Sequence, residues 1–228
     1  MDEVALFKKV ISVFWEPSAT FASLKLHTTW VDVLIPLLIV IVVSLAILPY
    51  ISPIAVSYQK GLIEKSERFS DEQKDAVYER MERQTNPLRM SITTTIAILA
   101  KALIITLALW FAGNFLLGGE AKFLVIFSLT AYVGLIELAS MAVKYPLIIS
   151  QETIQVYTSP ALFFEDNGSF LFRFLTTLDV FAIWKVIVSS IGLSVIYEKK
   201  LGKTATIVTI LWLIYCFGVS LLGSLVKM

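Results

Sequence analysis

The chain has 228 residues, of which 57% are hydrophobic and only 16% charged, and its mean hydropathy is +0.79. Soluble domains carry about 25% charged residues, so the composition excludes a soluble globular protein. The 19 basic residues are balanced by 18 acidic ones, which argues against the basic surface that nucleic-acid binding requires. The single cysteine, Cys216, excludes a disulfide framework and a multi-cysteine metal site.

Five apolar segments are long enough to cross a bilayer as helices. A hydrocarbon core about 30 Å thick needs about 20 apolar residues in a helix, whose backbone groups bond to one another rather than to lipid. No segment alternates as a membrane β-strand does, so we predict an all-α fold, with one membrane domain over residues 1–228. The predicted spans are 31–49, 91–117, 123–149, 174–197 and 204–226.

The distribution of lysines predicts how these spans are oriented. No uninterrupted apolar core precedes the first span, so we expect no cleaved signal peptide. Lysines are concentrated on the side of the amino terminus, whereas the opposite side carries a charge-balanced loop and an acidic one. The positive-inside rule then predicts a cytoplasmic amino terminus and an outside carboxyl terminus. The lysines concerned are Lys8, Lys9, Lys25, Lys122, Lys199, Lys200 and Lys203.

An amphipathic helix is predicted within the amino-terminal segment, residues 1–29. At about 100° per residue, residues 4–16 place apolar side chains on one arc and polar ones on the other. Such a helix can lie along the cytoplasmic headgroup surface or pack against the bundle, and the sequence supports the two alternatives equally. The residues assigned to this interfacial helix are Leu6, Phe7, Lys8, Lys9, Val10, Phe14 and Trp15.

Residues 50–90 form the one sizeable hydrophilic loop. Within it, Ser70 and Gln73 have the spacing of a capping box, which predicts a helix over 71–84. The helix has a narrow apolar stripe and a face rich in salt bridges, which we interpret as solvated, with partner binding as the alternative.

Two other connections have recognisable turn residues. Gly118 and Gly119 suit a tight turn, so the second and third spans should form an antiparallel hairpin. Residues 161–172 hold a turn at Asp166-Asn167-Gly168 between aromatic flanks, and this loop is expected to cap the bundle or to act as a lid.

The side chains of the common intramembrane enzymes are missing. His27 is the only histidine and precedes the first span, which excludes an HExxH zinc site and an intramembrane Ser-His dyad. There is no glycine-rich phosphate loop, and Asp179 is the one aspartate expected well inside a span. We therefore assign no catalytic residues, no metal site and no cofactor.

Charged residues occur inside the predicted spans, where an uncompensated charge costs ~2.5 to 3.5 kcal/mol. When two neighbouring helices are antiparallel, residues that lie at the same depth have residue numbers with nearly the same sum. This rule matches Glu137 with Lys185 and Lys144 with Asp179. Lys101 can join the inner pair. An ionic clamp between helices is one interpretation, and a polar pathway for protons, ions or lipid headgroups is the other. This intramembrane charge cluster comprises Lys101, Glu137, Lys144, Asp179 and Lys185.

Several short motifs resemble those of a known family. They are Pro17-Ser18-Ala19-Thr20-Phe21, Gly118-Gly119-x-x-Lys122-Phe123 leading to Ala131-Tyr132, and Asp179-x-Phe181-x-Ile183-Trp184 with Gly192. The pattern resembles the prokaryotic branch of the Yip family, whose eukaryotic members are named for interaction with Ypt/Rab GTPases. The resemblance implies five spans, a cytoplasmic amino terminus, self- or hetero-association and, in eukaryotes, Golgi-related traffic. The chain lacks the long cytosolic amino-terminal region and the Asp-Leu-Tyr-Gly-Pro-type motif, which argues against Rab binding.

Two functions remain open from the sequence. The first is a non-enzymatic membrane-organising or trafficking-type adaptor in a prokaryotic cell membrane, which associates with itself or with other membrane proteins. The second is a small transporter or lipid-handling protein that uses the intramembrane charges. The expected partners are the lipid bilayer and a second copy or another membrane protein, with no nucleic acid and with any ion or small-molecule substrate unspecified.

Overall fold

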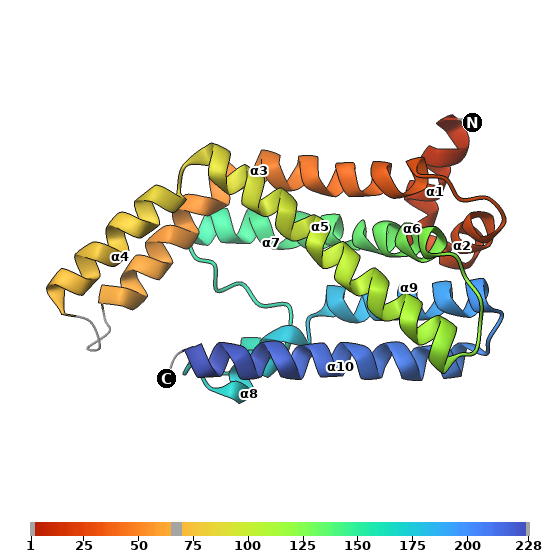
Figure 1. The fold of residues 1–228 in the computed structure, drawn as a ribbon. Helices are drawn as coiled ribbons and strands as arrows, with labels where there is room; N and C mark the ends of the chain where they lie inside the picture. The colour runs from red at the N-terminus through yellow and green to blue at the C-terminus, as the bar shows by residue number, and fades with distance from the viewer. Residues whose placement is uncertain (1–2, 65–69, 227–228) are drawn as a thin grey trace.

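The computed structural model describes residues 3–64 and 70–226, and in this part of the chain all regular structure is helical (Figure 1). Five of the helical stretches are long and apolar enough to span a membrane: Val31–Glu64, Pro87–Leu116, Phe123–Gln151, Val180–Tyr197 and Leu201–Ser224. The predicted all-α architecture with five candidate spans is therefore confirmed. The elements are α1 (Glu3–Trp15), α2 (Pro17–Leu26), α3 (Val31–Glu64), α4 (Asp71–Gln84), α5 (Pro87–Phe111), the π-helical turn η1 (Ala112–Leu116), α6 (Phe123–Gly134), α7 (Ile136–Gln151), the 3-10 turn η2 (Pro160–Phe163), α8 (Phe170–Thr177), α9 (Val180–Tyr197) and α10 (Leu201–Val226).

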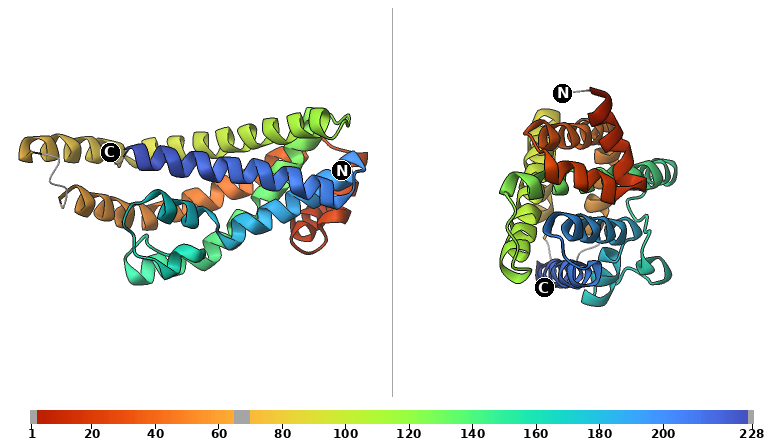
Figure 2. Two further views of the ribbon diagram at one scale, coloured as in Figure 1. Left: turned by 90° about the horizontal axis from the view of Figure 1, so that it is seen from below. Right: turned by 90° about the vertical axis from the view of Figure 1, so that its right-hand side faces the viewer.

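The spans run roughly side by side, so the connections lie at two ends of the bundle (Figures 1 and 2). One end, which we call the α1–α2 end, holds these two helices, the α5–α6 connection and the α9–α10 turn. The other end holds α4, α8 and the end of α10. The seven lysines that predict the orientation all lie in helices or connections at the α1–α2 end.

The first span is longer than predicted. Instead of ending at residue 49, α3 continues to Glu64, with Pro36, Pro49 and Pro53 inside it. A proline inside a helix removes only one N–H from the helical ladder, and α3 passes all three prolines without ending. The predicted loop over 50–90 is thus mostly helical, and its residues 65–69 lie outside the described part of the chain.

Within this region the short helix predicted over 71–84 is present as α4. The backbone N–H of Ser70 donates to the Gln73 side chain, and the Ser70 hydroxyl accepts from the Gln73 N–H. This reciprocal pair is the expected capping box. The following helix, α5, starts at Pro87 behind an Asn86 cap, four residues before the predicted start of the second span.

The fourth span is shorter than predicted and is preceded by a separate helix. Residues 174–197 were expected to be continuous, but α8 ends at Thr177 and α9 starts at Val180. The side chain of Asp179 accepts hydrogen bonds from the N–H groups of Phe181 and Ala182, so it caps a new helix. Asp179 therefore lies at the end of a span, and the prediction that placed it well inside one is wrong.

Glycines allow α9 to approach its neighbours closely. A Cβ on Gly119 would lie 2.2 Å from the Tyr197 ring, and one on Gly113 would lie 2.1 Å from it. The Tyr197 hydroxyl donates to Asn114, within η1. Gly118 has φ +61, which a side chain would strain. The predicted glycine turn is thus present, and its second glycine makes room for an aromatic ring of α9.

The amino-terminal segment belongs to the core of the bundle. Phe21 and Leu24 of α2 are fully buried, and α2 packs on α9. At Gly192 of α9, a Cβ would lie 3.0 Å from the Phe21 ring and 2.6 Å from Leu129 of α6. Residues before the first span therefore fill space between α6 and α9 that a side chain on α9 would otherwise occupy.

Candidate functional site

The inner charge pair joins α7 to α9. The Lys185 ammonium donates to the Glu137 carboxylate at 2.6 Å, which is one of the two pairs expected from the residue numbering. The two side chains stay 26% and 35% exposed within the protein, although both lie in spanning helices. The two charges therefore neutralise each other, while both side chains stay partly accessible from outside the bundle.

The outer pair ties α7 to the start of α9. Lys144 donates to Asp179 at 2.6 Å, with 23% of the lysine side chain and 14% of the aspartate side chain exposed. The Thr158 hydroxyl donates to the same carboxylate, and the Val180 N–H donates to the Thr158 carbonyl at 3.2 Å. This expected pair is thus part of a larger network that also holds the loop after α7.

Hydrogen bonding determines the charge state of Asp179. Burial opposes ionisation, but hydrogen bonds from Lys144 and Thr158 outweigh it and hold the pKa of Asp179 below its ordinary value. The carboxylate thus stays charged at neutral pH, which suits both the ion pair and the helix cap.

Lys101 is a cation near the middle of the second span, and its side chain is exposed on the surface of α5. It interacts electrostatically with Glu137 and Lys185, as expected for a member of the inner layer. No ion pair among residues 3–64 and 70–226 involves it. The inner layer of Lys101, Glu137 and Lys185 therefore carries a net positive charge inside the membrane region.

A further ion pair was missed from the sequence. Lys9 of α1 donates to Asp32 of α3 at 2.8 Å, and the Asp32 side chain is only 1% exposed. Thr29 also donates to this carboxylate through its N–H and its hydroxyl. The sequence contained a sign of this pair, since Asp32 lies in the first turn of the first span and the preceding helix α1 carries lysines. Lys9, which was assigned to the interfacial helix, is therefore paired with a buried carboxylate of the bundle.

The interfacial helix divides its apolar residues between the bundle and the outside. Val13 is fully buried, and the Phe14 ring meets Trp184 of α9 edge to face at 5.9 Å. Leu6 and Val10 are half-buried. Three of its large apolar side chains, Phe7, Ile11 and Trp15, remain exposed. Lys8 is exposed as well. One side of α1 therefore packs on the protein, and the other presents apolar and basic groups together.

At the end of the bundle that holds α4 and α8, a polar contact joins the part of α3 beyond residue 49 to the loop over 161–172. The Tyr58 hydroxyl donates to Asp166 at 3.4 Å, and Gln155 donates to both Tyr58 and Asp166. The predicted turn is present, with Gly168 at φ 66. Tyr58 was not expected to take part, since the first span was predicted to end before it.

The charged residues of the bundle do not converge on a metal site in the described parts of the chain. Across residues 3–64 and 70–226, no group of three or more His, Cys, Asp or Glu side chains could hold a metal ion. The arrangement is instead one of paired charges that join helices.

One comparison with known proteins identifies a relationship. The family model described as the Yip1 domain matches residues 11–222, which include the four residues of both interhelical pairs and Lys101. Comparisons with curated proteins and with solved structures gave no match.

Proposed function

Since the chain belongs to the Yip1 domain family, whose members are non-enzymatic, trafficking-related membrane proteins, we propose that it is a membrane-organising adaptor that associates with itself or with other membrane proteins. We assign this role to one membrane domain over residues 1–228, of the prokaryotic branch of the family. The ion pairs Glu137–Lys185 and Lys144–Asp179 serve in it as clamps that fix α7 against α9.

The observation that carries this proposal is the apolar surface of α5 and α10. Large apolar side chains on both helices are exposed, among them Ile104 at 66% on α5 and Ile214 at 64% on α10. Lys101 lies on α5 within this surface. A cation among apolar side chains in hydrocarbon is costly, so a carboxylate from a neighbouring membrane helix would be favoured there.

Site-specific photocrosslinking in native membranes tests the proposal. A photoreactive residue at Ile104 or Ile214 should give crosslinks to a second copy or to another membrane protein, whereas the buried Leu129 position is the matched control. Lys101→Met should weaken the products from Ile104. Products from neither exposed position would refute an adaptor role for this surface.

We place the amino terminus in the cytoplasm of a prokaryotic cell, with α1 on the headgroup surface. The exposed Lys8, Phe7 and Trp15 support this placement, since basic and aromatic side chains suit the membrane interface. A cysteine at position 8 of a variant that lacks Cys216 should react with an impermeant reagent only after the cells are opened. Labelling of intact cells would reverse the orientation.

A small transporter or lipid-handling protein is the second candidate. The partial exposure of Glu137 and Lys185 within spanning helices favours it, because accessible intramembrane charges often mark pathways. Reconstituted liposomes assayed for proton, ion and lipid flux distinguish the two functions. Flux that is lost with Glu137→Gln supports transport, and absence of flux supports the adaptor.

A further inference from the structure

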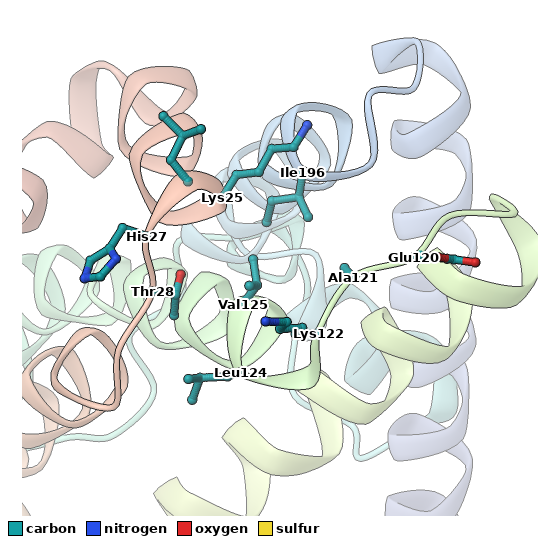
Figure 3. A pocket seen from close by; sticks show the side chains of 10 residues that line it. Lys25, His27, Thr28, Glu120, Ala121, Lys122, Leu124, Val125 and Ile196 are labelled. Atoms are coloured by element: carbon teal, nitrogen blue, oxygen red, sulfur yellow. The ribbon is translucent and has the colours of Figure 1, made fainter.

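A pocket of about 400 Å³ lies at the α1–α2 end of the bundle (Figure 3). Its walls come from the connection between α2 and α3, from the start of α6 and from the end of α9. One span ends beside it and two begin beside it, so it lies where the helices pass from hydrocarbon to headgroups. Its polar lining consists of Lys25, His27, Thr28, Glu120 and Lys122.

Lys122 supplies the uncompensated positive charge of this pocket. Figure 3 shows its ammonium end directed toward the space beside Thr28 and Val125, while the Glu120 carboxylate is turned away. No ion pair in the described parts of the chain involves Lys122. The pocket therefore contains the Lys122 ammonium, while the carboxylate of Glu120 points away from it.

The second lysine of the pocket is already paired. Lys25 donates to Glu198, and this hydrogen bond lowers the pKa of the Glu198 carboxyl. Glu198 is therefore ionised at neutral pH and neutralises Lys25. Lys25 contributes a wall of the pocket, and Lys122 determines the sign of its charge.

The start of α6 adds donors beside Lys122. Lys122 is the N-cap residue of α6, and no side chain caps this end of the helix. Leu124 and Val125 of the first turn line the pocket. The positive end of the helix dipole thus reinforces the lysine within the same cavity.

We propose that this pocket binds a phosphate group, held mainly by the Lys122 ammonium. Lysine acts as a point-charge ligand for phosphate, and the volume suffices for a phosphate with a small substituent. The position favours the headgroup of an anionic phospholipid as its source. Leu26 is exposed at the pocket and Trp30 is exposed shortly after it, and both suit the lipid interface.

The test measures thermal stabilisation of the full-length protein in detergent. The probes are dihexanoyl phosphatidic acid, dihexanoyl phosphatidylcholine and inorganic phosphate, each titrated to obtain an apparent affinity. The variants are Lys122→Gln, Glu120→Gln and, as matched control, Lys203→Gln, an exposed lysine at the same end that does not line the pocket. Melting temperatures without any probe report whether each variant folds.

Phosphatidic acid should stabilise the unaltered protein more than phosphatidylcholine does. Lys122→Gln should weaken its binding by roughly tenfold or more, as loss of a charge-assisted hydrogen bond does. Glu120→Gln should strengthen binding, and Lys203→Gln should leave it nearly unchanged.

Inorganic phosphate separates the two sources of the ligand. Weak stabilisation by inorganic phosphate assigns the site to a lipid headgroup, whereas equal stabilisation that also depends on Lys122 assigns it to free phosphate. Equal effects of Lys122→Gln and Lys203→Gln, or no preference for phosphatidic acid over phosphatidylcholine, would overturn the proposal. None of these results depends on association through α5 and α10.

Discussion

Asp179 has two structural roles that substitution can separate. Its carboxylate caps α9 through the N–H groups of Phe181 and Ala182 and also pairs with Lys144 at 2.6 Å. Asparagine is about as good a cap as aspartate, so Asp179→Asn removes the charge and keeps the cap. Asp179→Ala removes both roles, and Lys144→Gln removes only the lysine charge.

The structure gives the expected magnitudes. Both side chains are less than a third exposed, so the pair should contribute in the range of a charged hydrogen bond, about 1.5 to 3 kcal/mol. Loss of the cap costs a further ~0.5 to 2 kcal/mol. Asp179→Ala should therefore lower the free energy of unfolding by more than Asp179→Asn. Exchanging the two charges should recover only part of the loss, because lysine at position 179 cannot cap α9.

A double-mutant cycle of Asp179→Asn and Lys144→Gln measures the interaction directly. Reversible unfolding in mixed micelles with a denaturing detergent provides the free energies, with tryptophan fluorescence as the signal. A coupling energy below about 0.5 kcal/mol would refute the assignment of this pair as a clamp.

Three further comparisons have clear expected outcomes. Gly119→Ala should destabilise the protein by ~1 to 3 kcal/mol, because its Cβ would overlap the Tyr197 ring. The control Gly218→Ala, whose Cβ would have nothing within 4 Å, should not destabilise the protein. Equal melting temperatures of the two variants would contradict the close packing of Tyr197 on Gly119. Tyr132→Phe should be neutral or stabilising, since its buried hydroxyl has no hydrogen-bond partner among the described residues, whereas Tyr197→Phe should cost about 1 kcal/mol. Because the folded-state pKa of Asp179 is lowered, its contribution to stability should be full above the ordinary aspartate pKa of ~3.9 and be lost as the pH falls through the lower folded-state value. Melting curves from pH 6 to 3 should therefore show a smaller decline for Asp179→Asn than for the unaltered protein.

The sequence was sufficient for the features that depend on hydrophobicity and helix geometry. Long apolar runs predicted the five spans, and the capping box predicted α4. Residue numbering identified both pairs between α7 and α9, because antiparallel helices of similar tilt keep residues at one depth together. These features depend on one helix or on two adjacent ones.

Other features depended on contacts that a local pattern does not contain. α3 continues past Pro49 and Pro53, although proline usually interrupts helices. The Lys9–Asp32 pair requires the angle at which α1 meets the bundle, which the amphipathic pattern leaves undetermined. The pocket beside Lys122 is formed by three segments far apart in the chain. Such arrangements follow from packing and become visible only in three dimensions.

The packing of α2 on α9 has a consequence for biosynthesis. Phe21 of α2 is synthesised early, but Gly192, against which it packs, follows about 170 residues later. At a synthesis rate of about 5 to 20 residues per second, this delay is roughly 10 to 30 seconds. During that time the apolar side of α2 has no partner in α9, and the membrane surface is the nearest environment that can cover it. The segment of α1 and α2 should therefore be among the last parts of the bundle to reach its final position, although it leaves the ribosome before the spans do.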